Sequence, residues 1–184
     1  MKKAYLIHCW GGNSEGAWYN WLKKELEKKD ITVYLFDMPD TNNPKMETWL
    51  KYMEENIPVD SLDEETYFVG HSIGCQTIMR FLEKLPKQKN IGGCVFVAGW
   101  FDLINLKPEE IEIAHPWINT KIDFARIKRH TDNFTAIFSD NDPVVHLDES
   151  KKFKEQLGAK IIIKKKQGHF DSVDKIPEIL KVIK

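Results

Sequence analysis

The sequence predicts a three-layer α/β/α fold in which about six mostly parallel strands form a doubly wound sheet. Six short apolar runs alternate with helical patterns almost from end to end, which implies right-handed crossovers and helices on both faces of the sheet. The first run, residues 4–8, is nearly all apolar, as in a strand that is covered on both faces. At 184 residues, the chain fits one domain, residues 1–184, that buries about 70% of its unfolded surface.

In the first third of the chain, two helices and a second strand follow the first strand. An amphipathic helix over 17–28 is predicted by apolar residues at helical spacing, Trp18, Trp21, Leu22 and Leu26. Residues 31–36 predict the second strand. An apolar stripe that begins after Asn43-Pro44 and stops at Pro58 predicts the second helix.

The rest of the chain continues the alternation. Strands are predicted at 66–69, 94–98, 134–138 and 160–164. A helix over 73–85 is closed by Pro86, and a helix that carries Phe153 and Leu157 ends at Gly158. A last helix is predicted from the stripe formed by Ile176, Ile179, Leu180 and Ile183.

The segment Val69-Gly70-His71-Ser72-Ile73-Gly74 places a serine between a strand and a helix. In this setting Gly-x-Ser-x-Gly is typical of the nucleophile elbow of α/β-hydrolases, a strained turn that exposes the serine hydroxyl. Gly70 and Gly74 let strand and helix approach closely, and the helix N-terminus directs free N–H groups at the oxygen that becomes negative during acyl transfer. The alternative is a tight turn without chemistry, because the motif is short.

Asp142 and His169 follow Ser72 in the chain order that this fold requires. Asp142 lies just beyond the fifth strand and His169 just beyond the sixth, so both belong to the edge of the sheet where Ser72 emerges. A serine becomes nucleophilic when an imidazole accepts its proton, and a carboxylate holds the imidazole in the correct tautomer. We predict that Ser72, His169 and Asp142 form a catalytic triad.

Other acids and histidines compete for these roles. Asp140 is an alternative as a turn-capping residue, and Asp102 follows the fourth strand, from which some lipases of this fold supply the acid; Asp142 is preferred because Asp-x-x-Val just past the fifth strand is the motif that the fold uses. His8 and His71 flank turns and are interpreted as packing and hydrogen-bonding groups. His115 belongs to the long connection after the fourth strand, and His130 and His146 lack a matching context.

The oxyanion hole requires two backbone donors. One is the amide of Ile73, which follows the nucleophile. The other is expected from the loop after the first strand, where Trp10 is the candidate, provided that the first and third strands are neighbours.

Residues 99–133 form a connection that is longer than usual between the fourth and fifth strands, and its apolar content is too high for a disordered segment. We interpret it as a small cap over the active site; the alternative is an insertion that only packs on the domain. Its large apolar residues are expected to line a substrate pocket, with Trp10 on the opposite side: Trp100, Phe101, Leu103, Leu106 and Trp117.

Composition narrows the partners. A net charge of −1 without a basic cluster gives no reason to expect nucleic acid. The longest mainly apolar run, 91–101, is far short of a membrane span of about 20 residues. Cys9, Cys75 and Cys94 show neither metal-ligand nor disulfide spacing, which indicates reduced thiols and a cytoplasmic protein. The triad chemistry requires no metal or organic cofactor.

Together these motifs resemble the small serine hydrolases of the YdeN and retinoblastoma-binding-protein-nine type, a minimal branch of the α/β-hydrolase superfamily. The likeness covers nearly the whole length, and its marks are residues 18–26, 38–40, 70–74, 142–143 and 168–170. The resemblance implies a compact hydrolase fold and places nucleophile, acid and base on Ser72, Asp142 and His169. One departure is His8-Cys9, where the family commonly has His-Gly; the side chain of Cys9 restricts φ.

The sequence therefore predicts a serine hydrolase that cleaves a small ester, thioester or activated amide through an acyl-enzyme, with a small-molecule acyl substrate as its partner. The alternative is a protein-interaction module that keeps the hydrolase scaffold but has little turnover.

Overall fold

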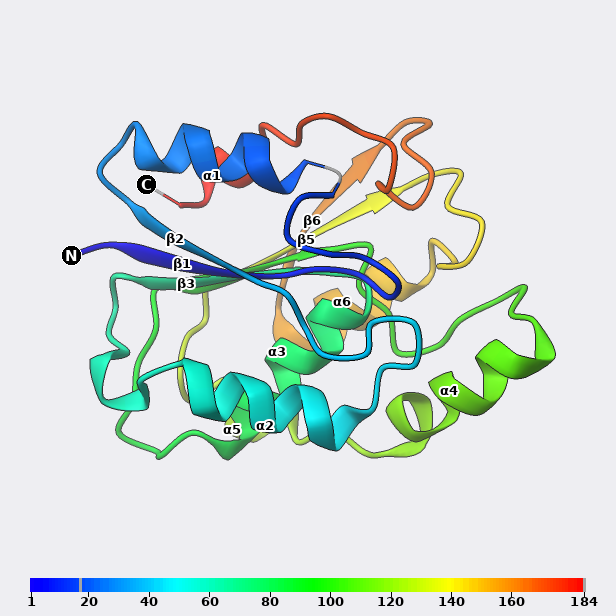
Figure 1. The fold of residues 1–184 in the computed structure, drawn as a ribbon, viewed down its shortest axis with the longest axis horizontal. Coiled ribbons are helices and arrows are strands. Elements are labelled where there is room, and N and C mark those ends of the chain that lie inside the picture. The colour runs from blue at the N-terminus through cyan, green and yellow to red at the C-terminus, as the bar shows by residue number, and fades with distance from the viewer. Residues whose placement is uncertain (17, 184) are drawn as a thin grey trace.

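The structure, a computed structural model, describes residues 1–16 and 18–183. Its centre is one six-stranded sheet in the order β2-β1-β3-β4-β5-β6 (Figure 1). All five strand pairs are parallel, as the sequence predicts. The strands are β1 Lys3–Ile7, β2 Thr32–Phe36, β3 Thr66–His71, β4 Gly93–Val97, β5 Phe134–Ser139 and β6 Lys160–Lys164.

Helices cover both faces of the sheet (Figure 1). The step from β1 to β2 runs in one direction along the sheet, whereas the later steps run in the other. Right-handed crossovers therefore place α1 on one face and the later helices on the opposite face. The first layer holds α1 Tyr19–Glu27 and the 3₁₀ helix η2 Ile179–Lys181; the second holds α2 Met46–Asn56, α3 Ile73–Lys84 and α6 Glu149–Leu157.

Each face of the sheet has its own buried core. Trp18, Leu22 and Leu26 pack between α1 and the sheet, and Trp49 and Phe153 belong to the larger core on the other face. The helical spacing of apolar residues predicts these helices and the side of each one that is buried. Burial of the apolar side chains in these two cores stabilises the fold by about 25 cal/mol per Å² of apolar surface.

The edge at the carboxyl ends of the strands holds the switch point of the sheet. β1 and β3 are neighbours, and the chain leaves them toward opposite faces. A Cβ atom on Gly74 would overlap the carbonyl oxygens of Ile7 and His8, so the start of α3 rests directly on the end of β1. Only glycine permits this approach, which brings the loop after β1 beside Ser72.

The helix predicted from the stripe at residues 176–183 is not formed; this prediction is wrong. The segment instead forms the 3₁₀ helix η2, in which Leu180 donates to the carbonyl of Pro177 and Lys181 to that of Glu178. Ile176 and Ile179 are buried all the same. A spacing of three residues returns to the same side in a 3₁₀ helix as well, so the apolar pattern could not distinguish the two.

The other elements begin and end within a few residues of their predicted bounds. α1 begins at Tyr19, while the predicted start at Ala17 lies outside the described residues. α2 begins at Met46, after Lys45 as its N-cap. Gly158 ends α6 in the left-handed conformation at φ 69°, as a C-terminal glycine does.

The long connection after β4 contains two helices, α4 Pro108–Asn119 and α5 Phe124–Ile127. A short 3₁₀ helix, η1 Val59–Ser61, precedes β3. Across residues 1–16 and 18–183, no helix has both the length and the apolar content that a membrane crossing demands.

Candidate active site

Ser72 stands alone between β3 and α3, with φ 55° and ψ −119°. This conformation is strained for a residue with a side chain, and it costs about 1–3 kcal/mol. The strain is held in place because the Ser72 amide donates to the Val97 carbonyl at 2.8 Å. A Cβ atom on Gly70 would lie 2.7 Å from the Cys75 nitrogen, so this glycine is required as well. The geometry is that of the strand–turn–helix elbow expected from the sequence.

His169 and Asp142 meet across the ends of β5 and β6. The Nδ1 atom of His169 lies 2.8 Å from Oδ2 of Asp142. The second oxygen of Asp142 accepts the amides of Val144 and Val145, both at 2.9 Å. The Asp142 side chain is 2% exposed and the His169 side chain 11%. The carboxylate is thus fixed, and it holds the proton of His169 on Nδ1 and leaves Nε2 as the acceptor.

The competing acids do not contact His169. Asp140 accepts the amide of Lys166 at 2.8 Å, and the exposed Asp102 accepts the amide of Leu103 at 2.9 Å. Asn141 was not singled out from the sequence, yet its Oδ1 accepts the amide of Gly168 at 2.9 Å. Asn141 therefore connects the loop of the acid to the loop of the base.

The hydrogen-bond partner of Ser72 Oγ is Nε1 of Trp100, at 3.3 Å. Within the described part of the chain no hydrogen bond joins Ser72 to His169. A serine–histidine bond of this kind is often long without substrate and tightens when substrate binds. Because Ser72 Oγ accepts from Trp100, its own hydroxyl proton is free to point at an imidazole.

Two backbone amides near Ser72 have no partner among residues 1–16 and 18–183. They belong to Ile73, the first residue of α3, and Trp10, in the loop after β1. The left-handed residue of this loop is Gly11, at φ 66°, and Cys9 has no positive φ. The side chain at position 9 therefore imposes no backbone strain, and both amides are available to an oxyanion.

Ser72 and His169 line a cavity of about 550 Å³. Leu103 and Leu106 from the long connection, and Trp10 from the opposite side, line it as expected. The lining also includes two carboxylates, Glu110 and Asp171, that the sequence did not single out. The full set is Cys9, Trp10, Gly11, Gly12, Asn13, Gly16, Tyr19, Ser72, Leu103, Leu106, Glu110, Pro143, Val144, His169 and Asp171.

Trp100, Phe101 and Trp117 do not belong to this lining, contrary to expectation. Trp100 is fully buried, and its Nε1 donates to Oγ of Ser72. Trp117 is buried, donates from Nε1 to the Pro44 carbonyl at 3.0 Å and packs edge-on against Trp49. Phe101 packs against Phe153 with 4.6 Å between ring centroids and the ring planes tilted by 31°. Phe101 and Trp117 instead line a separate cavity of about 270 Å³, because apolar character predicts burial but not the neighbour.

The beginning of the long connection is attached to the loop of the acid. The Ile104 amide donates to the Val144 carbonyl at 2.9 Å, and the side-chain amide of Asn105 donates to the Pro143 carbonyl at 2.8 Å. The end of the connection is held by Arg80, which donates to the carbonyls of Trp117 and Thr120. The connection is thus anchored at residues 104–105 and again at residues 117–120.

The chain is similar in sequence to known serine hydrolases. The serine hydrolase family matches residues 4–182. YdeN of Bacillus subtilis (strain 168) is 30% identical over 169 residues, which span 92% of this chain and 86% of YdeN. The serine hydrolase RBBP9 of Rattus norvegicus is 25% identical over 185 residues, which span 99% and 94%.

Solved structures support the same relationship. The crystal structure of the ydeN gene product from B. subtilis superimposes with a TM-score of 0.89 and 27% identity, covering 100% of this chain and 97% of that one. Est1E from Butyrivibrio proteoclasticus, solved with ferulic acid bound, gives a TM-score of 0.73 at 15% identity, covering 100% and 87%. The six-stranded parallel sheet with its two helical layers is therefore an α/β hydrolase fold.

Proposed function

The chain belongs to the serine hydrolase family, and we propose that it is a carboxylesterase-like enzyme that cleaves small esters, thioesters or activated amides through an acyl-enzyme. The observation that carries this proposal is the ordered contact of His169 with Asp142, 2.8 Å, at the cavity into which the strained Ser72 emerges. A tight turn without chemistry has no need of a buried acid–imidazole pair on the same cavity.

In the proposed reaction, Ser72 Oγ attacks the carbonyl carbon while Nε2 of His169 accepts its proton. Asp142 stabilises the imidazolium, and the amides of Ile73 and Trp10 stabilise the oxyanion. The imidazolium then protonates the leaving group, and water attacks the acyl-enzyme with His169 again as the base. No further group is required to balance protons or charge.

The lining of the cavity favours substrates of particular charge. Glu110 and Asp171 contribute carboxylates, while no lysine or arginine is among the residues that line it. An anionic substrate would be repelled and a cationic one attracted, and Trp10 adds an aromatic face that suits a cation. We therefore propose uncharged or cationic acyl esters as the substrate class, and disfavour phosphate- or carboxylate-bearing ones.

The long connection over 99–133 acts in this proposal as a fixed cap. Leu103 and Leu106 form an apolar wall of the cavity, and the hydrogen bonds to Pro143 and Val144 hold that wall beside Asp142. A closed wall of this kind discriminates acyl chains by length, at about 1–3 kcal/mol per methylene.

A reducing, cytoplasmic location is also proposed. Cys9, Cys75 and Cys94 are free thiols. Burial raises the pKa of Cys9 to about 11, so this thiol next to the cavity is a poor nucleophile. Fractionation of cells that produce the protein would test the location directly.

A fluorophosphonate probe tests the proposed activity, because only an activated serine reacts with it. The wild type should be labelled and should hydrolyse a short p-nitrophenyl ester. Ser72→Ala should lose both while it keeps its fold and melting temperature, with a fall in kcat of about 10⁶-fold. A wild type that is folded but neither labelled nor active would favour the interaction module without turnover.

A further inference from the structure

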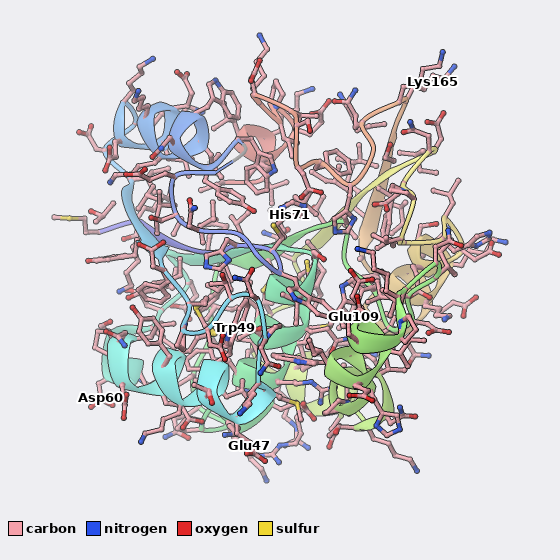
Figure 2. All side chains as sticks on the ribbon, turned by 45° about the vertical axis from the view of Figure 1, so that its right-hand side comes forward. Glu47, Trp49, Asp60, His71, Glu109 and Lys165 are labelled. Carbon is pink, nitrogen blue, oxygen red and sulfur yellow. The ribbon has the colours of Figure 1, made fainter. Side chains whose placement is uncertain are left out.

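A chain of hydrogen bonds beside the cavity joins the loop after β1 to the loop of His169, through Tyr19 of α1 and His71 of β3. The Cys9 amide donates to the hydroxyl of Tyr19 at 3.3 Å, and that hydroxyl lies 2.6 Å from Nδ1 of His71. The other ring nitrogen of His71, Nε2, lies 2.7 Å from the carbonyl oxygen of His169. Tyr19 and His71 are almost fully buried, and Figure 2 shows His71 in the interior of the molecule.

Only one proton arrangement satisfies every atom of this chain. The His169 carbonyl is an acceptor, so Nε2 of His71 carries the proton and Nδ1 is left as an acceptor. Tyr19 therefore donates its hydroxyl proton to Nδ1, and its oxygen accepts the Cys9 amide. Burial, and then the neighbouring His169, lower the pKa of His71 to about 3. The ring stays neutral, and it keeps this arrangement when His169 becomes cationic.

The backbone around His169 needs such support. Gly168 has φ 56° and Phe170 has φ 63°, so the base stands between two residues in the left-handed region. For Phe170 this conformation is costly. Several hydrogen bonds hold this loop. Next to His169 they are the His71 donation to the His169 carbonyl, the Gly168 amide to Asn141, and the Phe170 amide to the Gln167 carbonyl.

We propose that Tyr19 and His71 are positioning residues for His169. This inference rests on the proposed function. His71 fixes the backbone of the base so that its ring meets Asp142, and Tyr19 couples that loop to the Cys9 amide, one residue before the proposed oxyanion donor Trp10. Tyr19 and His71 thus form one buried bridge, which fixes the position of the base His169 relative to the proposed oxyanion donor Trp10.

The same atoms resemble a metal site, since Cys9, His71 and Asp171 offer ligand atoms within 4.8 Å of one another. The hydrogen bonds argue for the bridge instead. Nε2 of His71 would have to give up the His169 carbonyl in order to bind a metal, and the loop of the base would lose its support. The raised pKa of Cys9 also disfavours the thiolate that a metal prefers.

Tyr19→Phe tests the bridge, because it removes one hydroxyl and keeps the ring. We expect kcat for a short ester and the rate of fluorophosphonate labelling to fall by about 10–100-fold, as for a small displacement of a catalytic group, with KM within twofold of the wild type. The acid limb of the kcat/KM profile should move to lower pH, because a displaced imidazole is stabilised less by Asp142. Tyr5→Phe is the matched control: Tyr5 is also buried but belongs to the core on the other face of the sheet.

A pair of substitutions at the histidine tests the donor itself. In His71→Gln the side-chain amide can still donate to the His169 carbonyl, whereas His71→Leu has no donor. We expect kcat of His71→Gln to be at least tenfold higher than that of His71→Leu. Equal activities of these two variants, or a Tyr19→Phe enzyme with unchanged kcat and pH profile, would overturn the proposal.

The pKa of His169, measured by NMR titration of the ring in wild type and Tyr19→Phe, reports on positioning without turnover. A lower pKa in the variant supports the bridge, and identical values refute it. Failure of the proposed function would look different, since the wild type itself would then show neither labelling nor hydrolysis.

Discussion

Asp142 uses one oxygen for His169 and the other for the backbone of its own loop. Oδ2 lies 2.8 Å from Nδ1 of His169, and Oδ1 accepts the amides of Val144 and Val145. The carboxylate cannot rotate without losing two bonds. Because the two oxygens have different partners, the effect of a conservative substitution at position 142 can be predicted.

In Asp142→Asn, the two amides of the loop require the side-chain oxygen, so the new NH₂ group must face His169. It would donate to Nδ1 and force the proton of the imidazole onto Nε2, the atom that has to accept from Ser72. We expect kcat to fall by about 10⁴-fold, as for the wrong tautomer in other triads. Esterase kinetics measure this directly. Asp140→Asn and Asp102→Asn should have mild effects, and a larger loss in Asp102→Asn would mean that the acid is misassigned.

His71 makes stability depend on pH. Its pKa of about 3 in the folded protein lies below the ordinary value of 6.5, so unfolding takes up a proton between these values. The stabilisation that comes from keeping this ring neutral is therefore fully present above pH 6.5 and is lost as the pH falls toward 3. Over this range the free energy of unfolding decreases by at most about 1.4 kcal/mol per pH unit. Burial also lowers the pKa of His8, which adds in the same direction.

Urea denaturation at several pH values between 7 and 4 measures that slope. His71→Gln should make it shallower, whatever the absolute stability of the variant, because one proton fewer is taken up on unfolding. A slope that is unchanged in the variant would show that His71 does not titrate in this way.

The wall of the cavity sets a further prediction. Leu103→Ala and Leu106→Ala enlarge the space beside Ser72, so the preferred acyl chain should lengthen by one or two carbons, as judged from kcat/KM over an ester series. Trp117→Ala should leave the preference unchanged, because Trp117 faces Trp49 and not the cavity. It should instead cost about 3–5 kcal/mol of stability. If Trp117→Ala changed the preferred acyl chain length without loss of stability, Trp117 would have to be assigned to the wall of the cavity and not to the core.

Charge selectivity is tested with three esters of equal length, one with a trimethylammonium group, one with its uncharged tert-butyl counterpart and one with a carboxylate. The cationic ester should have the highest kcat/KM and the anionic one the lowest. Glu110→Gln should reduce the cation-to-anion ratio by about threefold, or about 0.65 kcal/mol, which lies within the range of about 0.2–1 kcal/mol that a solvent-exposed ion pair contributes. The ratio should also decrease with added salt.

Glu110→Gln is a clean change, since the Lys107 amide that donates to Glu110 can donate to the glutamine oxygen as well. Glu109→Gln is the matched control: Glu109 is exposed on the same turn of α4 and does not line the cavity (Figure 2). Equal ratios in the wild type and both variants would show that the Glu110 carboxylate does not select substrates.

The alternation of strands and helices, the elbow around Ser72 and the order in which Asp142 and His169 follow can all be predicted from the amino-acid sequence. These features are local. Apolar periodicity is set by which side of an element avoids water, and the residues that follow parallel strands must share one edge of the sheet. Three distant segments could therefore be assigned to one site before any contact was known.

The neighbours of each buried side chain, in contrast, depend on how the elements pack together. Trp100 presents its indole N–H to Ser72, Trp117 turns to Trp49, and Tyr19 and His71 join two loops from below. A pattern of apolar residues states that a side chain is buried, but its direction depends on the element that packs against it. Hydrogen bonds between residues that are 52 and 98 positions apart leave no periodic trace in the sequence, because their geometry exists only once the sheet has brought those loops together.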